Sequence, residues 1–468
     1  MTHVQATTLG ELKASGFEIL SVREEMRRNL MRKLADDEEV FPGIIGYQDS
    51  VIPQIENAIL SGQDIILLGE RGQAKSRLIR SLITLLDEYT PILDGVEIPE
   101  NPLKPISAQA KKLIEEKGDE TPIRWLERKD RYGEKLATPD ITIADLIGEI
   151  DPIKIAEGRY LSDEEAIHFG LVPHTNRGIF AINELPDLAE RIQVGLLNVM
   201  EERDVQIRGH KIRMELDIMI VATANPEDYT NRGRIITPLK DRYGSQIRTH
   251  YPQSVSEEIA IMEQEQSKLD LGEYREKVPS YMQQIIAEIT QIARESPDIS
   301  QTSGVSVRAT VANYETLLAN ALRRAIRTGE QDIVPRISDL PFIMPSLQGK
   351  VEFEAMEEGQ EEKIMQKLFD DAIRSVFSRY TDPDDVESIS LQFTEGLNVT
   401  TGESLASEDY ASIIRQIDGM DAAVAKLCPD NNLALRASAT EFILEGLHLN
   451  HLLNKDQVSG RSTYQAAG

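Results

Sequence analysis

The sequence predicts an α/β fold in which helices cover both faces of a parallel sheet. Three short, almost entirely apolar runs carry this prediction: Ile65–Leu68, Gly178–Ile182 and Ile218–Ala222. Runs of this length without polar alternation are typical of strands that are buried on both faces. Apolar residues at helical spacing follow two of the runs, over Ser76–Tyr89 and Leu188–Glu202. Strands that alternate with helices in this way favour a doubly wound domain.

The 468 residues exceed a single ordinary core, so several domains are expected. The first helix is expected near Val22–Leu34, because Ser21 and Glu24 form a capping-box pattern before it. The predicted segments are an N-terminal helical segment over 1–37, the α/β domain over 38–252, a helical lid over 253–345 and an acidic, mostly helical extension over 346–468. Within them, residues 90–138 show no regular pattern, Asp204–Leu216 alternates like a β-hairpin, and the tail Ser459–Gly468 is expected to be disordered.

Composition narrows the class of protein. The chain has 79 acidic and 51 basic residues, a net charge of −28, which disfavours nucleic acid as the main partner. No run approaches the about 18 consecutive apolar residues that would span a bilayer. The one cysteine, Cys428, has no partner for an internal disulfide, and the N-terminus lacks a signal-like apolar core. A cytoplasmic location is therefore expected.

The first apolar run leads directly into a glycine-rich loop with the pattern G-x-x-x-x-[A]-K-S. The residues that we expect to bind phosphate are Gly69, Glu70, Arg71, Gly72, Gln73, Ala74, Lys75, Ser76 and Arg77. Glycines let the backbone turn its N–H groups toward phosphates, and the helix that follows adds its positive dipole end. Lys75 is expected to reach the β- and γ-phosphates of ATP, and the Ser76 hydroxyl to ligate Mg²⁺.

Ala74 departs from the usual pattern, in which a glycine precedes the lysine. Alanine is tolerated if its φ stays below zero, although it crowds the backbone near the phosphates. The alternative interpretation of the loop is an ordinary glycine-rich turn with a solvent-facing lysine.

The second apolar run ends in two polar residues, Asn183 and Glu184. In ATPases with such a loop, this strand ends in an aspartate for the Mg²⁺ shell and a glutamate that polarises the attacking water. Glu184 fits the second role, whereas Asn183 offers a carbonyl oxygen without a charge. We expect weaker Mg²⁺ binding or slower turnover from this replacement. The alternative is a strand end with an incidental glutamate.

Three further polar residues complete the candidate site. Asn225, after the third run, has an amide suited to holding the water near the γ-phosphate. Arg242 and Arg308 each carry a fixed charge on a planar fork that matches phosphate. Arg242 is expected to complete a neighbouring subunit's site, and Arg308 to sense the γ-phosphate from the lid. Each arginine taken alone is more often part of a surface ion pair.

With these elements in order, the chain resembles the AAA+ ATPases of the magnesium-chelatase I-subunit and MoxR clade. The resemblance covers roughly residues 38–325. Its motifs are the adenine-side segment Phe41–Gln48 with Gly46 and Tyr47, the Walker A loop Gly69–Ser76, the Walker B strand Thr175–Glu184, sensor 1 at Thr223–Pro226, the arginine-finger segment Lys240–Gly244 and sensor 2 at Ser306–Arg308. Asp145–Asp151 followed by Gly158 is similar to the insertion that precedes Walker B in chelatase subunits.

The resemblance implies a hexameric ring with ATP and Mg²⁺ at subunit interfaces, in which Arg242 acts across the interface. It also implies a partner with a von Willebrand factor A domain, which the motor remodels or uses to drive metal insertion. Two alternatives stay open: a true magnesium-chelatase ATPase subunit of tetrapyrrole biosynthesis, and a nucleotide-gated scaffold that scarcely hydrolyses ATP.

Overall fold

The computed structural model describes residues 6–151, 153, 166–202, 205–207, 210–212, 214–225, 233–268, 270–300, 303–354, 359–458 and 460–467. The predicted motif residues Gly158 and Pro226 lie outside the described residues. The chain divides into two compact units, Met1–His250 and Tyr251–Gly468. The predicted boundaries at 37/38, 252/253 and 345/346 stay predictions.

The first unit is built on a five-stranded parallel sheet with the strand order β11-β1-β10-β7-β4. The strands of this unit are β1 (Ile65–Leu68), β2 (Tyr89–Leu93), β3 (Ile123–Glu127), β4 (Tyr132–Leu136), β5 (Gly148–Ile150), β6 (Ile167–Phe169), β7 (Gly178–Asn183), β8 (Val205–Ile207), β9 (His210–Ile212), β10 (Ile218–Ala224) and β11 (Ser245–Arg248). The α-helices are α1 (Leu9–Ser15), α2 (Val22–Ala35), α3 (Val51–Leu60), α4 (Lys75–Ser81), α5 (Ala108–Lys117), α6 (Ile143–Leu146), α8 (Leu171–His174), α9 (Glu190–Glu202) and α11 (Thr237–Arg242).

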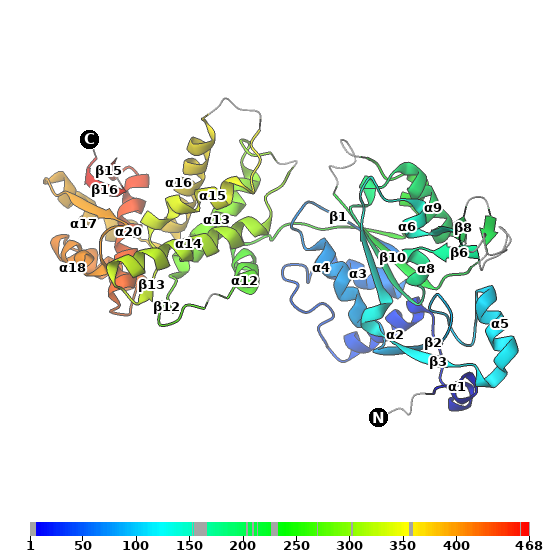
Figure 1. Cartoon of the computed structure of the whole chain (residues 1–468). Helices are drawn as coiled ribbons and strands as arrows, with labels where there is room; N and C mark the ends of the chain where they lie inside the picture. Colours follow the sequence, from blue (N-terminus) through cyan, green and yellow to red (C-terminus); the bar gives the residue numbers. More distant parts are fainter. Residues whose placement is uncertain are drawn as a thin grey trace. The chain divides into compact units, whose positions relative to one another are not determined.

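Alternate residues of the buried strands pack into two separate cores, one on each face of the sheet. Ile179 and Ala181 of β7 belong to the core that α2, α3 and α4 cover. Phe180 and Ile182 belong to the core that α6, α8 and α9 cover (Figure 1). Because side chains alternate along a strand, a run that is apolar at every position buries both faces. This arrangement confirms the predicted α/β fold class.

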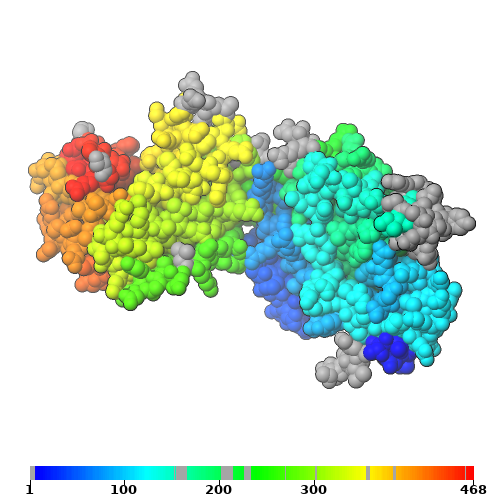
Figure 2. Space-filling model, viewed as in Figure 1, coloured from blue at the N-terminus to red at the C-terminus, as the bar shows by residue number. Residues whose placement is uncertain are grey.

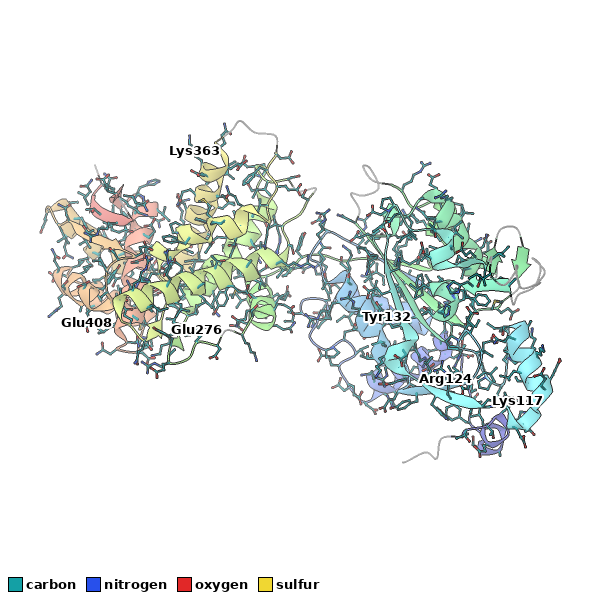
Figure 3. The ribbon with its side chains drawn as sticks, in the orientation of Figure 1. Lys117, Arg124, Tyr132, Glu276, Lys363 and Glu408 are labelled. Atoms are coloured by element: carbon teal, nitrogen blue, oxygen red, sulfur yellow. The ribbon has the colours of Figure 1, made fainter. Side chains whose placement is uncertain are left out.

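Two features of residues 76–138 differ from expectation. The helix after β1 ends at Ser81, and a 3-10 turn over Leu82–Leu85 replaces its second half. Tyr89–Leu93 is extended instead, because it pairs antiparallel with Ile123–Glu127. The segment 90–138, which showed no regular pattern, also supplies β4, an edge strand of the central sheet that begins at Tyr132 (Figure 3).

The N-terminal helices pack against this unit. Glu25 of α2 and Arg131, just before β4, form a buried ion pair with two N···O distances of 2.6 Å. Arg131 also donates to the carbonyl of Arg177 at 2.7 Å, so the pair joins α2 to the start of β7. Helix α1 lies at the surface beside the segment around residue 119, where Lys13 pairs with Asp119 (Figure 2).

The second unit is mainly helical. Its α-helices are α12 (Val255–Glu265), α13 (Ser280–Glu295), α14 (Val307–Thr328), α15 (Met344–Gln348), α16 (Glu361–Tyr380), α17 (Pro383–Thr394), α18 (Ser407–Gln416), α19 (Met420–Leu427) and α20 (Leu433–Leu449). Its strands are β12 (Arg275–Glu276), β13 (Asp332–Ile333), β14 (Val399–Gly402), β15 (Leu453–Val458) and β16 (Arg461–Ala466). One hydrophobic core runs from Met262 to Tyr464, so the residues of the predicted lid and of the predicted extension pack together.

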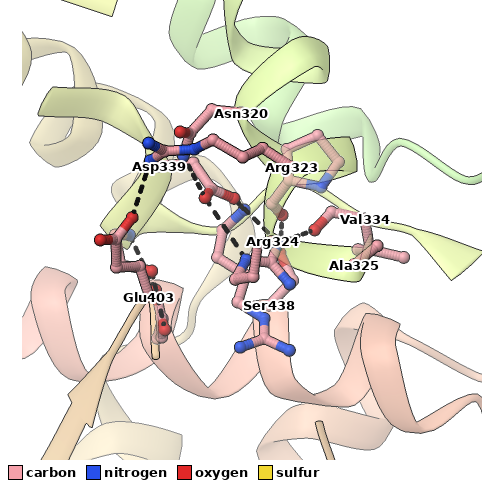
Figure 4. A network of polar contacts seen from close by, with 12 residues as sticks. Asn320, Arg323, Arg324, Ala325, Val334, Asp339, Glu403 and Ser438 are labelled. Carbon is pink, nitrogen blue, oxygen red and sulfur yellow. Dashed lines mark hydrogen bonds and ion pairs between the residues drawn. The ribbon is translucent and has the colours of Figure 1, made fainter. Parts of the chain in front are cut away.

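A buried polar network lies inside this unit, where α14 meets the segment that follows β13 (Figure 4). Arg324 donates to Asp339 at 2.9 Å, and Asn320 donates to the same carboxylate at 2.7 Å. Buried charges are stable only when they are paired and hydrogen-bonded, and this network meets that condition for Asp339.

The expected disorder of the C-terminal tail is wrong for its described residues. Arg461–Ala466 forms β16, the central strand of an antiparallel sheet with the order β14-β16-β15. Tyr464 is buried there, and its hydroxyl donates to Glu445 at 2.5 Å. The sequence of Arg461–Ala466 is mostly polar and does not predict a strand, because only one of its side chains, that of Tyr464, enters the core.

Candidate nucleotide-binding site

The glycine-rich loop lies between the end of β1 at Leu68 and the start of α4 at Lys75. Gly69 admits no side chain: a Cβ there would lie 1.9 Å from Thr249 Oγ1 and 2.2 Å from Gln73 Oε1. Gly72 has φ 78°, which glycine adopts without strain. The loop therefore closes tightly on itself because of these two glycines.

Gln73 and Lys75 fill the inside of the loop. Gln73 Oε1 accepts hydrogen bonds from Glu70 N at 3.1 Å and from Thr249 Oγ1 at 2.7 Å. Lys75 is only 7% exposed, and its ammonium donates to the carbonyl of Glu70 at 2.7 Å and to that of Gly69. The solvent-facing lysine of the alternative interpretation is thus not what the structure has.

Ala74 does not have the negative φ at which alanine is tolerated without strain. It lies in the left-handed region with φ 54° and ψ 15°, immediately before α4. That conformation costs a non-glycine residue about 1 kcal/mol or somewhat more. The loop geometry that glycine would adopt freely is therefore retained here with backbone strain.

Tyr47 connects the predicted adenine-side segment to the loop. Its hydroxyl lies 2.9 Å from the carbonyl oxygen of Gln73 and 2.7 Å from that of His250. Burial raises the pKa of Tyr47 to about 12. Gly46, with φ 83°, provides the turn that precedes it.

The carboxyl ends of β7 and β10 bring polar side chains to the same edge as the loop. Ser76 Oγ donates to Asn183 Oδ1 at 3.4 Å, and Thr223 Oγ1 lies 3.3 Å from the same oxygen. Thr223 Oγ1 also accepts from the backbone N–H of Glu184 at 3.0 Å, which fixes the turn where Glu184 has φ 56°. Asn225 is buried directly after β10.

Glu134 of β4 also lies at this edge, although no motif in the sequence indicates it. Its Oε1 accepts a hydrogen bond of 2.5 Å from Asn183 Nδ2. Arg80 of α4 holds the same carboxylate with two bonds of 2.8 Å. The pKa of Glu134 lies below its usual range, mainly because Arg80 donates hydrogen bonds to it. The positive charge of Arg80 and the hydrogen bond from Asn183 lower the pKa further, and together these effects outweigh partial burial, which raises it. The only sequence signal was a glutamate inside the short alternating stretch Tyr132–Leu136.

The predicted arginines lie in different places. Arg71 and Arg77 are exposed on the loop and on the first turn of α4. Arg242, the last residue of α11, forms ion pairs with Glu201 and, at 3.5 Å, with Asp241. Arg308 is exposed in the first turn of α14, in the second unit.

The donor set fits a nucleoside triphosphate and a hard divalent cation. Backbone N–H groups at a helix start and a lysine ammonium match phosphate oxygens. A serine hydroxyl and an amide oxygen are ligand types that Mg²⁺ accepts directly or through water. Lys75, Ser76 and Asn183 supply these groups at one edge of the sheet.

Comparison with known proteins agrees with this geometry. A family model described as the sigma-54 interaction domain matches residues 155–239. The chain is 25% identical over 264 residues to the magnesium-chelatase 38 kDa subunit of Rhodobacter capsulatus, a match that covers 53% of this chain and 67% of the relative. It is 24% identical over 266 residues to the magnesium-chelatase subunit ChlI of a Nostoc species, covering 54% and 64%. The chain thus spans about two thirds of the length of these curated relatives.

Among solved structures, a chain of the BchI–BchD complex of magnesium chelatase matches with 19% identity and a TM-score of 0.35, over 70% of this chain and 98% of that one. NtrX from Brucella abortus matches with 14% identity and a TM-score of 0.40, over 74% and 66%. The sheet order, the glycine-rich loop and the sequence matches make the chain similar to AAA+ proteins. The curated relatives that it matches are magnesium-chelatase subunits.

No helix in the described part of the chain is long and apolar enough to cross a membrane.

Proposed function

We propose that this chain is a Mg²⁺-dependent ATPase subunit that couples ATP binding and hydrolysis to remodelling of, or metal insertion by, a partner protein. The observation that carries the proposal is the enclosed ammonium of Lys75, held within a loop that joins a buried parallel strand to a helix. A side chain at Gly69 would displace Thr249 and Gln73, which close the loop. A cytoplasmic location and the MoxR side of the resemblance remain predictions.

In this proposal the loop binds the phosphates and its neighbours hold the cation. Lys75 contacts the β- and γ-phosphates, with N–H groups of the loop that includes Glu70, Arg71, Gly72, Gln73, Ala74 and Arg77 around them. Ser76 and, through water, Asn183 hold Mg²⁺, which when bound neutralises charge that develops on the phosphates. Gly46 and Tyr47 lie on the adenine side.

Hydrolysis is assigned to the polar ends of β7 and β10. Glu184 orients and polarises the attacking water, and Asn225 positions it. Arg242 acts across a subunit interface, and Arg308 couples the second unit to the nucleotide. In the isolated chain Arg242 is paired with Glu201, so action across an interface requires that this exposed ion pair opens. Exposed pairs are worth only about 1 kcal/mol or less, which makes such opening accessible.

For assembly we propose a homo-oligomeric ring, a hexamer, with a partner that carries a von Willebrand factor A domain. The curated relatives are named as subunits of magnesium chelatase, which supports work in a larger assembly. A true magnesium-chelatase role in tetrapyrrole biosynthesis is the narrower form of the proposal. A porphyrin-metallation assay with candidate partner subunits tests that form.

A weakly hydrolysing scaffold is the second candidate, and two observations favour it. Ala74 is strained in the left-handed region, and Asn183 brings no charge to the predicted Mg²⁺ position. Both reduce the expected turnover without removing the phosphate loop.

One substitution tests the loop that both candidates share, and a second separates the candidates. Lys75→Ala should abolish ATP binding, measured by titration with a fluorescent ATP analogue, whereas Lys111→Ala, at an exposed position of α5, should not change it. Tight ATP binding by Lys75→Ala would refute the phosphate-loop role. Glu184→Gln should keep ATP binding and lower steady-state phosphate release by about 100-fold or more. If wild type and Glu184→Gln release phosphate at the same background rate, the scaffold function is correct.

A further inference from the structure

Asn183 is held between two groups of different chemistry. Its Nδ2 donates to Glu134 Oε1 at 2.5 Å, while its Oδ1 lies 3.4 Å from Ser76 Oγ and 3.3 Å from Thr223 Oγ1. Asn183 is nearly buried, so water does not readily replace these partners. The amide therefore bridges the carboxylate of the edge strand β4 and the hydroxyl that follows the phosphate loop.

The carboxylate determines which way this amide points. An ionised carboxylate only accepts hydrogen bonds, whereas the two ends of an amide differ, one donating and one accepting. The guanidinium of Arg80 donates two hydrogen bonds to Glu134, which favours the ionised form of the Glu134 carboxyl group. Asn183 must then present its NH₂ group to Glu134 and its oxygen to Ser76. The reverse orientation would place two acceptors against each other and an NH₂ group where a cation is expected.

Building on the proposed function, we propose that Glu134 is the positioning carboxylate of the Mg²⁺ site and acts through Asn183. Glu134 directs the amide oxygen of Asn183 toward the position where Ser76 would hold the cation. Glu134 also supplies the negative charge that an aspartate at position 183 would have brought, but one side chain further from the cation. An amide at 183 and a carboxylate at 134 are thus one functional pair divided between β7 and β4. Glu134 contacts the cation's ligand and not the cation.

The pair also predicts which replacements are compatible. Asn183→Asp alone would set two carboxylates in contact, and their repulsion disfavours two negative charges there. Glu134→Gln sets two amides in contact and leaves no carboxylate. It removes the charge and replaces one acceptor oxygen by an NH₂ group. Because Oε1 accepts from both Arg80 and Asn183 while Oε2 accepts from Arg80, that NH₂ group faces a donor in either orientation, and Asn183 is no longer held with its oxygen toward Ser76 by a charge. The exchange Glu134→Gln with Asn183→Asp restores one carboxylate and one amide, with the charge now beside Ser76.

The test measures Mg²⁺ coupling and needs no turnover. Full-length variants are titrated with a fluorescent ATP analogue in excess Mg²⁺ and again in EDTA, and the ratio of the two Kd values is the readout. We expect Glu134→Gln to lower this ratio about 10-fold or more, as loss of a partner behind a metal ligand does, and to leave the Kd in EDTA unchanged. The exchange variant should return the ratio to the wild-type value or above it.

Arg80→Gln is the matched control. If Glu134 mattered only because it tethers α4 to β4, removing either partner would reduce the ratio equally. The inference requires that Arg80→Gln keeps the wild-type ratio or raises it, because the carboxylate is then less neutralised. A wild-type ratio in Glu134→Gln, an equal loss in Arg80→Gln, or no recovery in the exchange variant would overturn the inference and leave the proposed function standing. A wild-type chain that binds no nucleotide would overturn both.

Discussion

The hydroxyl of Tyr47 lies 2.9 Å from the carbonyl oxygen of Gln73, so a residue before the first strand contacts the glycine-rich loop. The same hydroxyl lies 2.7 Å from the carbonyl of His250, at the end of the first unit. Tyr47 thus joins three segments that are far apart in the sequence. Tyr47 contacts the backbone of Gln73, and Thr249 contacts the side chain of the same residue at 2.7 Å.

Tyr47→Phe should destabilise the first unit and weaken ATP binding. The substitution leaves buried carbonyl oxygens with one donor fewer, which costs about 1 kcal/mol, with an upper end of about 3 kcal/mol. Chemical unfolding measures the stability, and titration with an ATP analogue measures the affinity, which should fall several-fold. Tyr89→Phe, at an exposed tyrosine, is the control and should change neither. If Tyr47→Phe and Tyr89→Phe have the same stability and the same ATP affinity, the contact of Tyr47 with the loop does not stabilise it.

Ala74→Gly should stabilise the protein. Glycine adopts φ 54° without the clash that alanine has, and its greater freedom in the unfolded chain offsets part of this gain, so the net stabilisation is expected to be about 0.5 kcal/mol. The midpoint of urea unfolding of the first unit should therefore rise. Ala108→Gly, at the start of α5, is the matched control and should lose about 0.5–1 kcal/mol. If both substitutions lower the midpoint of urea unfolding, the backbone at Ala74 is not strained.

The ion pair of Arg80 and Glu134 should give a stability term that disappears in acid. The hydrogen bonds and charge of Arg80 lower the pKa of Glu134 in the folded chain below the ordinary 4.5. The stabilisation is therefore complete above pH 4.5 and is lost as the pH falls through the lower folded value. Arg80 is largely exposed, so the term is expected to be about 1 kcal/mol or less.

The measurement is the difference in free energy of unfolding between wild type and Glu134→Gln from neutral pH down to about pH 3. Arg80→Gln should follow the same course. A difference that grows as the pH falls would mean that the pKa is raised and not lowered.

Tyr464→Ala should destabilise the second unit. Its ring belongs to the core, and its hydroxyl donates to the buried Glu445, so about 3–5 kcal/mol is expected from the lost side chain. Val458→Ala in the neighbouring strand is the control, because that side chain is largely exposed. Thermal unfolding of the full chain checks both. An unchanged transition in Tyr464→Ala would restore the interpretation of the tail as disordered.

Much of the site could be predicted because it is local in sequence. Gly69, Lys75 and Ser76 lie within eight consecutive residues, and the strand before them is apolar at every position. Asn183 and Glu184 were found for the same reason, since each ends a buried run. Where the polar residue follows the strand directly, the parallel sheet brings it to the shared edge.

Glu134 and Thr249 could not be found in this way. Glu134 lies on a short edge strand whose alternation is weak, and Thr249 follows a strand of mixed polarity. Their roles depend on which strands are neighbours. The sequence does not encode that order locally, since β4 joins the sheet beside β7, about 45 residues later.

By itself, the sequence determined the α/β class, the glycine-rich loop between β1 and α4 and the two polar strand ends, because strand burial and loop conformation follow from residue types that are close together. The tertiary structure decided the left-handed conformation of Ala74, the pairing of Asn183 with Glu134 and the strand at the C-terminus. Asn183 and Glu134 are distant along the chain, and so are β14 and β16. Packing, and not local preference, sets their geometry.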